Sequence, residues 1–393
     1  MKKFKKAMSL LLVTAMTLSL AACGGSSESG SSSEGDVWKI GGIGPLTGGA
    51  AIYGLGVKNG AQIAVDEINA AGGINGYQIE YKFEDDELDN EKSVNAFNTL
   101  CDWGMQILMG TVTSGCCTAV ASETANVNMF QITPSGSSTD IIAGKTNVFQ
   151  VCFTDPNQGI ASAQYIGDNG LATKVAAIYD SSDVYSNGIY EKFKEEAKNY
   201  DFEIVAEGAF TADNKTDFSV QLQQAKDAGA ELLFLPIYYQ EASLILAQAD
   251  QMGYAPTFFG CDGMDGILGV ENFDTSLAEG LMLLTPFAAD AEDEATQSFV
   301  KKYKEMCDGE VPNQFAADAY DAVYAIKAAL EATELTPADD FSTICDVMKA
   351  AMVEINVVGL TSDAEGMTWA ETGEVSKAPK AVVIKNGAYV SAE

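Results

Sequence analysis

Short apolar runs alternate with amphipathic stretches along the chain from Val37 onwards. The apolar runs predict strands at 37–43, 77–84, 105–112, 128–133, 174–180, 202–209, 231–237 and 257–260. Apolar residues at helical spacing predict helices that include 57–71, 91–102, 185–200, 216–228 and 241–252. This alternation is typical of an α/β fold, in which a parallel sheet carries helices on both faces.

Two segments share one plan, which predicts two similar lobes. Trp38–Ile68 and Lys174–Ala197 each run from a strand through a polar loop to a Tyr followed by Gly or Ser, and then into an amphipathic helix. Each segment is expected to begin a doubly wound unit. Because ligands of such sheets bind beyond the carboxyl ends of the strands, two facing units predict a cleft lined by loops.

The N-terminus has the pattern of an export signal. Lysines crowd the first six residues, the apolar run Ala7–Leu20 follows, and Leu20–Cys23 reads Leu-Ala-Ala-Cys. The run is short for a membrane span, so we predict a signal peptide over 1–22 and lipidation of Cys23. Residues 23–36, mostly Gly, Ser and acidic, predict a flexible linker. The protein is then extracytoplasmic and anchored to the cell membrane by lipid; a secretory signal with an incidental Cys is the alternative.

Charge and residue usage exclude several classes of function. The net charge is −33, which disfavours binding to nucleic acid or to an anionic membrane surface, and its dispersal along the chain indicates a solvated acidic surface. There is no His, and all 23 basic residues are Lys. Ser-His-Asp and Cys-His catalysis, His-ligated metals and arginine clamps are therefore excluded. We expect no enzyme, no cofactor and no metal site.

The enzyme alternative is a nucleotide-dependent oxidoreductase. It would need a phosphate-binding loop after the first strand, but Gly42–Thr47 lacks the third glycine of such a loop, and the chain holds no Walker A lysine loop.

Beyond Cys23, the chain has an odd number of cysteines, so at least one thiol is free or pairs between molecules. None has metal-site spacing, and several lie in apolar runs, which predicts buried small hydrophobic residues with undecided pairing. They are Cys101, Cys116, Cys117, Cys152, Cys261, Cys307 and Cys345.

Two hydroxyl-rich loops each follow an apolar strand and precede a helix start. Gly110–Gly115 brings hydroxyls and free N–H groups to a helix N-terminus, where they can hold a carboxylate without a formal cation. Simple helix capping by Thr113 or Ser114 is the alternative. Thr133–Ser138 adds further hydroxyls, although alone it indicates only a turn and a cap.

Three residues of the second half lie just beyond predicted strand ends: Tyr185, Tyr238 and Asp262. A carboxylate at Asp262 can accept hydrogen bonds from an ammonium group, and tyrosine rings offer apolar walls with a polar edge. Taken singly, Asp262 before Gly263 is an ordinary turn aspartate. With the two loops, these residues predict a site for a zwitterion.

From about Val37 onwards the chain resembles the leucine/isoleucine/valine-binding proteins among the type 1 periplasmic-binding proteins. The resemblance is carried by Ile43–Gly48 with Tyr53-Gly54, by Gly60-Ala61 through Asp66–Asn69, by Gly72–Gly76 and by Glu84–Asp86. A disulfide found in some members would join positions that are Leu88 and Thr113 here, so that bridge is absent.

The resemblance implies a set of ligand contacts. Ser114, with Val112 and Thr113 beside it, matches the carboxylate contact, and Asp262 matches the acid that binds the ammonium. Ser135 and Ser137 match the second contact on the first lobe, Tyr53, Tyr185 and Tyr238 match the pocket tyrosines, and Phe315 matches an apolar wall.

The resemblance also implies the architecture and the role. Lobe 1 would comprise 37–154 plus 286–359, and lobe 2 would comprise 155–285 plus 360–393, joined by a three-strand hinge. The protein would be the solute-binding subunit of an ABC importer, closing on a small amino acid, most of all a branched-chain aliphatic one, and docking on membrane permease subunits. A sensor of the same fold, reporting amino acids or small amides to a membrane receptor, is the alternative.

Overall fold

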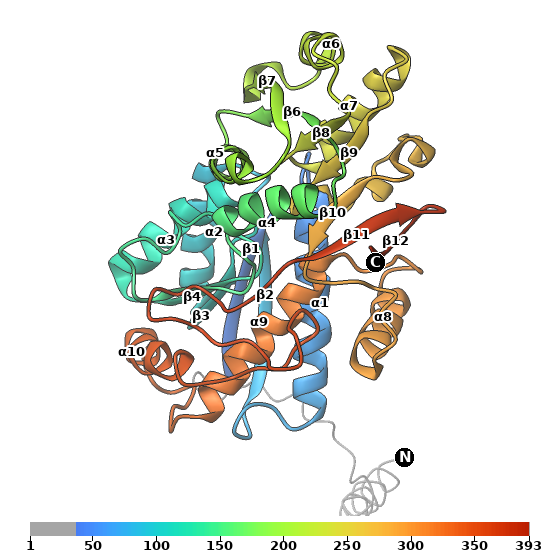
Figure 1. Ribbon diagram of the computed structural model, residues 1–393. Helices are drawn as coiled ribbons and strands as arrows, with labels where there is room; N and C mark the ends of the chain where they lie inside the picture. Colours follow the sequence, from blue (N-terminus) through green and yellow to red (C-terminus); the bar gives the residue numbers. More distant parts are fainter. Residues whose placement is uncertain (1–36, 393) are drawn as a thin grey trace, which may run out of the picture. The chain divides into compact units, whose positions relative to one another are not determined.

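The computed structural model describes residues 37–392 (Figure 1). The predicted signal peptide, Cys23 and the linker lie outside the described residues. The first sheet contains β1 (Val37–Gly44), β2 (Gln78–Asp85), β3 (Ile107–Gly110), β4 (Phe130–Thr133) and β5 (Val148–Gln150). Its strands are parallel in the order β2-β1-β3-β4-β5, and β3, β4 and β5 are buried along their whole length.

The second sheet repeats this arrangement. Its parallel strands are β6 (Lys174–Asp180), β7 (Glu203–Phe210), β8 (Leu232–Leu235), β9 (Thr257–Gly260) and β10 (Met282–Thr285), in the order β7-β6-β8-β9-β10. The antiparallel strands β11 (Lys380–Lys385) and β12 (Ala388–Ser391) continue it beyond β10. Because β6 lies between β7 and β8 as β1 lies between β2 and β3, the internal repeat predicted from the sequence is confirmed.

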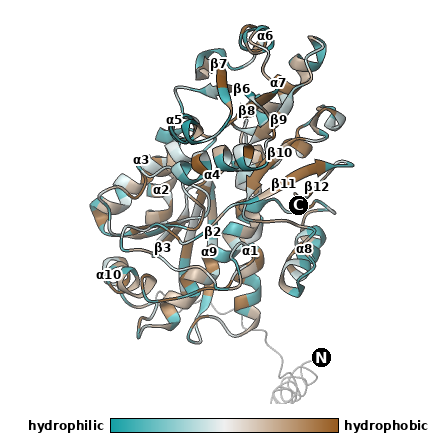
Figure 2. Ribbon diagram, viewed as in Figure 1, coloured by the Kyte–Doolittle hydropathy of each residue, from teal (hydrophilic) through white to brown (hydrophobic). Residues whose placement is uncertain are grey.

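The helices that follow the strands are α1 (Ala51–Ala70), α2 (Asn90–Trp103), α3 (Ser114–Val127), α4 (Asp155–Asp168), α5 (Val184–Glu196), α6 (Ser219–Asp227), α7 (Tyr239–Gln251), α8 (Glu294–Met306), α9 (Gln314–Glu331) and α10 (Phe341–Met352). Figure 2 shows hydrophobic strands between helices of mixed polarity, as expected when only one helix face is buried. The fold is thus two doubly wound α/β lobes with a three-strand hinge.

Glycines let α1 approach its neighbours closely. A Cβ on Gly60 would lie 2.0 Å from the carbonyl oxygen of Ala316 on α9, and one on Gly54 would lie 1.9 Å from that of Pro45. The second contact explains why α1 begins at Ala51 although the helical spacing predicts a start at 57: the first turn is held by tertiary packing. β3 is likewise shorter than its apolar run, since chain 111–113 turns toward α3.

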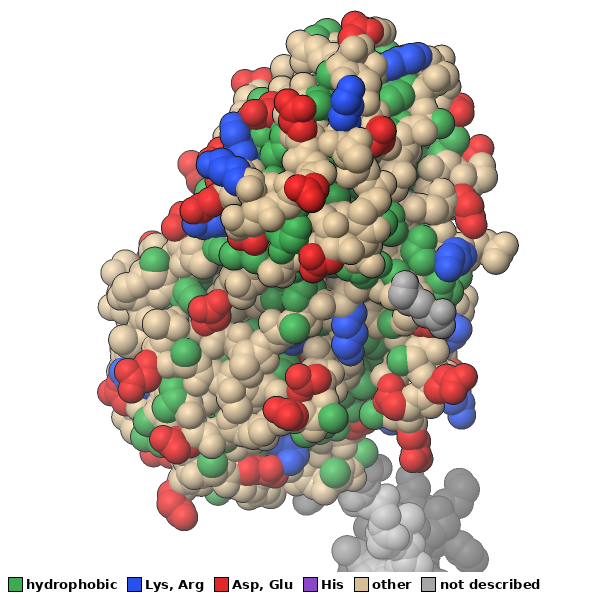
Figure 3. All heavy atoms as spheres, in the orientation of Figure 1, with side chains coloured by type: hydrophobic (Ala, Val, Ile, Leu, Met, Phe, Trp, Pro, Cys, Tyr) green, Lys and Arg blue, Asp and Glu red, His purple; other side chains and the backbone are tan. Residues whose placement is uncertain are grey.

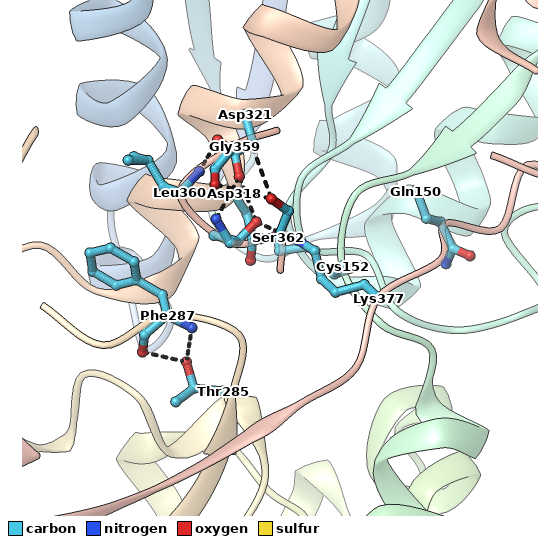
Figure 4. Close-up of polar contacts among 12 residues, drawn as sticks. Gln150, Cys152, Thr285, Phe287, Asp318, Asp321, Gly359, Leu360, Ser362 and Lys377 are labelled. Carbon is cyan, nitrogen blue, oxygen red and sulfur yellow. Dashed lines mark hydrogen bonds and ion pairs between the residues drawn. The ribbon is translucent and has the colours of Figure 1, made fainter. Parts of the chain in front are cut away.

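Three connections join the sheets, and Figure 4 shows parts of them, with Gln150 and Cys152 on the first, Thr285 and Phe287 on the second and Lys377 on the third. The helices α8 and α9 pack on α1 and α10 packs on β4, which supports the predicted assignment of 286–359 to lobe 1. The lobe bounds stay a prediction. Trp369 Nε1 donates to Gln150 O, and Gln150 N–H donates to Gly373 O. We therefore propose that the third crossing lies later than residue 360, between Lys377 and Lys380.

The surface and the thiols follow the sequence expectations. Figure 3 shows acidic side chains scattered over the visible face, with fewer lysines among them. The seven cysteines of the described chain form no disulfide; five are buried, and Cys101 and Cys307 are partly exposed. Between residues 37 and 392, no helix combines the length and apolar character needed to cross a bilayer.

Candidate ligand-binding cleft

One cavity between the lobes collects every ligand contact that the sequence predicted. The lining residues of the first lobe come from α1, from the start of α3, from the loop after β4 and from α9. The second lobe contributes from α5, from the residue before α7 and from the turn after β9. The lining residues are Tyr53, Val112, Thr113, Ser114, Ser135, Ser137, Tyr185, Tyr238, Asp262, Gly263 and Phe315. That they contact a ligand stays a prediction.

Neutral donors gather at the N-terminus of α3. Thr113 is the N-cap residue, but its side chain makes no capping hydrogen bond, and its buried Oγ1 has no partner in the described chain. The Ser114 hydroxyl accepts from the N–H groups of Ser137 and Ser138 at 3.2 Å each, which leaves its own proton free to donate. The geometry therefore favours an anion site over simple capping by Thr113, because these hydroxyls lie at the helix N-terminus, where the helix dipole favours negative charge.

The loop after β4 is fixed against the same strand ends. Ser135 Oγ donates to Val112 O at 2.8 Å, and Thr133 Oγ1 donates to Thr111 O at 2.7 Å. These side chain to backbone bonds hold two loops that are far apart in sequence. Ser135 and Ser137 therefore reach the cavity from a preorganised wall.

Asp262 supplies the opposite charge across the cavity. It is 3% exposed, and its Oδ1 accepts a hydrogen bond of 2.6 Å from Tyr185 Oη. Its own N–H donates to Gln158 Oε1 at 3.2 Å. Burial raises the pKa of Asp262 to about 7, although the Tyr185 hydroxyl opposes that shift. A cation beside this carboxyl would hold it ionised.

Aromatic rings form the apolar walls and meet across the lobe boundary. The ring centroids of Tyr53 and Phe315 are 4.5 Å apart, those of Tyr53 and Tyr238 are 5.6 Å apart, and Tyr185 stacks on Tyr238 at 5.0 Å. Tyr53 Oη also donates to Gly263 O at 2.5 Å, which ties α1 to the second lobe. The lobes are closed: the remaining cavity of about 20 Å³ has room on the order of one water molecule.

Sequence reasoning missed three residues near this cavity. Gly263 lines it directly, while Asp155 and Gln158 lie behind Asp262 on the first turns of α4. Both Asp155 oxygens and Gln158 Nε2 are buried without a partner in the described chain, and burial raises the pKa of Asp155 well above its ordinary value. The available signal was the run Asp155–Gly159, which follows an apolar segment and begins a helix.

A buried ion pair lies at the hinge (Figure 4). Lys377 Nζ donates to Asp318 Oδ1 at 2.8 Å, and both side chains are 1% exposed. Lys377 also donates to Thr361 Oγ1, whose hydroxyl donates to Asp321 at 2.6 Å. Burial raises the pKa of both carboxyls, and the Lys377 ammonium opposes that rise. Lys377, on the third connection, thus pairs directly with one buried carboxyl of α9 and is linked to the other through the Thr361 hydroxyl.

Comparison with known proteins gives a consistent result. The sequence pattern of the family described as "Periplasmic binding protein" matches residues 37–380. The "Leu/Ile/Val-binding protein homolog 3" of Brucella melitensis is 30% identical over 344 residues, with 86% of this chain and 88% of that protein covered.

Solved structures agree with this match. The branched-chain amino acid transporter substrate-binding protein LivJ of Streptococcus pneumoniae, in complex with isoleucine, superposes with a TM-score of 0.81 at 28% identity, covering 91% of this chain and 99% of LivJ. The leucine-binding protein LivK of Thermotoga maritima gives a TM-score of 0.80 at 26% identity, covering 91% and 98%.

Proposed function

Since the chain belongs to the periplasmic binding protein family, we propose that it is the extracytoplasmic solute-binding subunit of an ABC importer, and that it binds a small, branched-chain aliphatic amino acid between its lobes. The observation that carries the proposal is one cavity between the lobes whose lining combines neutral anion donors, Asp262 and aromatic walls. Relatives named for leucine, isoleucine and valine support the ligand class.

Each end of an amino acid has a matching group in this cleft. The carboxylate lies at the N-terminus of α3 against Thr113 and Ser114, with Ser135 and Ser137 beside it. The ammonium lies on Asp262, and the aliphatic side chain packs against Tyr53, Val112 and Phe315, with Tyr185 and Tyr238 closing the second wall. The charge-assisted hydrogen bonds fix orientation, while the apolar walls select side-chain shape.

Binding requires hinge motion. A cavity of about 20 Å³ does not admit an amino acid, so the lobes must separate for entry and close again on the ligand. The contacts divide between the lobes, so neither lobe alone encloses a ligand. The closed form then presents both lobes to the permease subunits.

We expect titration calorimetry to give saturable binding of leucine, isoleucine or valine. Small-angle scattering should show a smaller radius of gyration at saturation, because bound ligand shifts the lobes toward the closed form. Lysine and glutamate serve as controls, since the aromatic walls offer no partner for a second charge. Binding of none of the aliphatic amino acids, or identical scattering curves with and without a bound one, contradicts the proposal. Loss of labelled-ligand uptake in cells that lack the gene is expected of an importer, and unchanged uptake is expected of a sensor.

Lipid anchoring is part of the proposal and rests on the sequence alone. Cys23→Ser should leave a protein that takes up no labelled palmitate and is released from the membrane fraction. Its ligand affinity should equal that of the parent, since the anchor precedes the first residue of β1 and serves only location. Palmitate incorporation into the Cys23→Ser variant refutes the assignment, and a Cys101→Ser variant, which keeps Cys23, is the matched control.

A further inference from the structure

A second cavity lies beside the cleft and is much larger. Its volume is about 680 Å³, within the range of small-molecule sites. It is bounded by the first turn of α1, by α8, by the turn after β9 and by the β11–β12 hairpin, which Figure 1 shows next to α8 and β10. It shares no lining residue with the cleft. We call it the bridge cavity, because both lobes and a hinge connection line it.

The walls of the bridge cavity are largely hydrocarbon. Phe287 and Val300 are buried within it, and Leu268 lies on the second-lobe side. Leu55 and Val311 also line it and are 42% and 57% exposed. A ligand seated here would therefore remove apolar surface from water on both lobes.

The charges of the bridge cavity are mostly negative. Asp265 lines it and is 6% exposed, and its Oδ2 accepts a 2.7 Å hydrogen bond from the N–H of Gln314. No lysine of the described chain pairs with Asp265, Asp290 or Glu310, all of which line the cavity, and Lys304 is the one basic residue on its wall. Burial raises the pKa of Asp265 to about 7, as expected for a carboxyl without a cation.

We propose that the bridge cavity is a second ligand site, and that it takes a small aliphatic amine whose ammonium pairs with Asp265 and whose hydrocarbon packs against Leu55, Leu268 and Val311. The buried acid and the excess of negative charge select a cation over an anion. The apolar walls select a carbon chain over a metal ion.

This site is coupled to the cleft through one turn. Asp265 N–H donates to Asp262 O at 2.9 Å, and Gln314 bonds both residues, with its N–H on Asp265 and its Nε2 on Asp262 O at 3.1 Å. A ligand on Asp265 therefore acts on the peptide that positions Asp262. Because the bridge cavity also spans both lobes, an amine bound there changes the affinity of the cleft for the cleft ligand. The cleft ligand changes the affinity of the bridge cavity for the amine by the same factor.

The test is calorimetric titration of the purified protein with hexylamine, compared with hexanol and hexanoate. We expect hexylamine to bind at least tenfold more tightly than either analogue, since only the amine makes a charge-assisted hydrogen bond with Asp265. Asp265→Asn should weaken hexylamine binding at least tenfold, whereas Asp340→Ala, which removes an N-cap of α10 and lines neither cavity, should leave it within about twofold.

A second variant covers the case in which Asp265→Asn fails to fold. Leu55→Lys places a competing ammonium at an exposed position of the wall and should abolish hexylamine binding without lowering the melting temperature. The proposal is overturned if hexylamine does not bind, if hexanoate or hexanol binds equally well, or if Asp340→Ala weakens binding as much as Asp265→Asn. It is also overturned if sedimentation shows a dimer that Leu55→Lys dissociates, since the face would then be an interface between copies. The amine titration does not depend on which ligand the cleft takes.

Discussion

Asp262→Asn is expected to weaken binding of the cleft ligand about 10- to 150-fold, which corresponds to the loss of a charge-assisted hydrogen bond of about 1.5 to 3 kcal/mol. The change is nearly isosteric. Tyr185 Oη, which donates to Asp262 Oδ1 at 2.6 Å, can still donate to the amide oxygen. Among the described residues that line the cavity, Asp262 is the only one with a carboxylate, so no other side chain there can replace it as the partner of the ammonium. Titration calorimetry with leucine, isoleucine and valine measures the loss.

The affinity of the unaltered protein should also depend on pH. Burial raises the pKa of Asp262 to about 7 in the ligand-free fold, so below that pH the carboxyl must release a proton before it can pair with an ammonium. Affinity therefore falls as the pH drops through 7, and Asp262→Asn removes this step. In the absence of ligand the sign is opposite: the raised pKa makes Asp262 favour the folded state at acid pH, and that contribution is lost as the pH rises through about 7.

A control separates binding from stability. Asp340 caps α10, does not line the cleft, and accepts hydrogen bonds from the N–H groups of Ser342 and Thr343. Asp340→Ala should lower the melting temperature with unchanged affinity, because the α10 N-terminus loses its cap. If Asp262→Asn behaves in the same way, with a lower melting temperature and full affinity, then Asp262 only stabilises its turn and the proposed ammonium contact is wrong.

Lys377→Met should have the largest effect on stability, with the free energy of unfolding reduced by about 3 to 5 kcal/mol. Methionine keeps much of the volume but leaves Asp318 and Asp321 buried without a cation, where Lys377 now lies 2.8 Å from Asp318. The loss should shrink as the pH falls, because protonation of the carboxyls removes the unpaired charge and burial already raises their pKa values. Chemical denaturation at several pH values measures both effects.

Two variants test the cause of this loss. Lys349→Met breaks the pair with Asp346, in which the two side chains are 31% and 59% exposed, and should reduce stability far less than Lys377→Met because water screens that pair. Adding Asp318→Asn to Lys377→Met should restore part of the stability, since one unpaired charge is removed. A double variant no more stable than Lys377→Met would mean that the loss comes from packing of the lysine stem.

The sequence determined the local elements and the chemistry of the cleft. The alternation of apolar runs with amphipathic stretches was sufficient to predict β1, β6 and β9. Their observed bounds lie within one residue of those predicted. Lack of His and Arg left lysines, hydroxyls and backbone N–H groups as the available donors for an anion site. The resemblance to a known family then assigned the cleft residues, which the structure brings together around one cavity. The strands could be predicted because they depend on side chains a few residues apart, whereas the cleft residues, which lie between positions 53 and 315, needed the resemblance.

The tertiary structure alone decided what depends on contacts distant in sequence. The early start of α1 comes from its packing on Pro45, and the place of β10–β12 beside β9 comes from pairing across the second sheet. Lys377 and Asp318 are 59 residues apart, and no local pattern marks them as a buried pair. The bridge cavity likewise arises only where α1, α8 and the turn after β9 meet. Burial and charge at such points are set by the folded chain, because the neighbours that exclude water come from other segments.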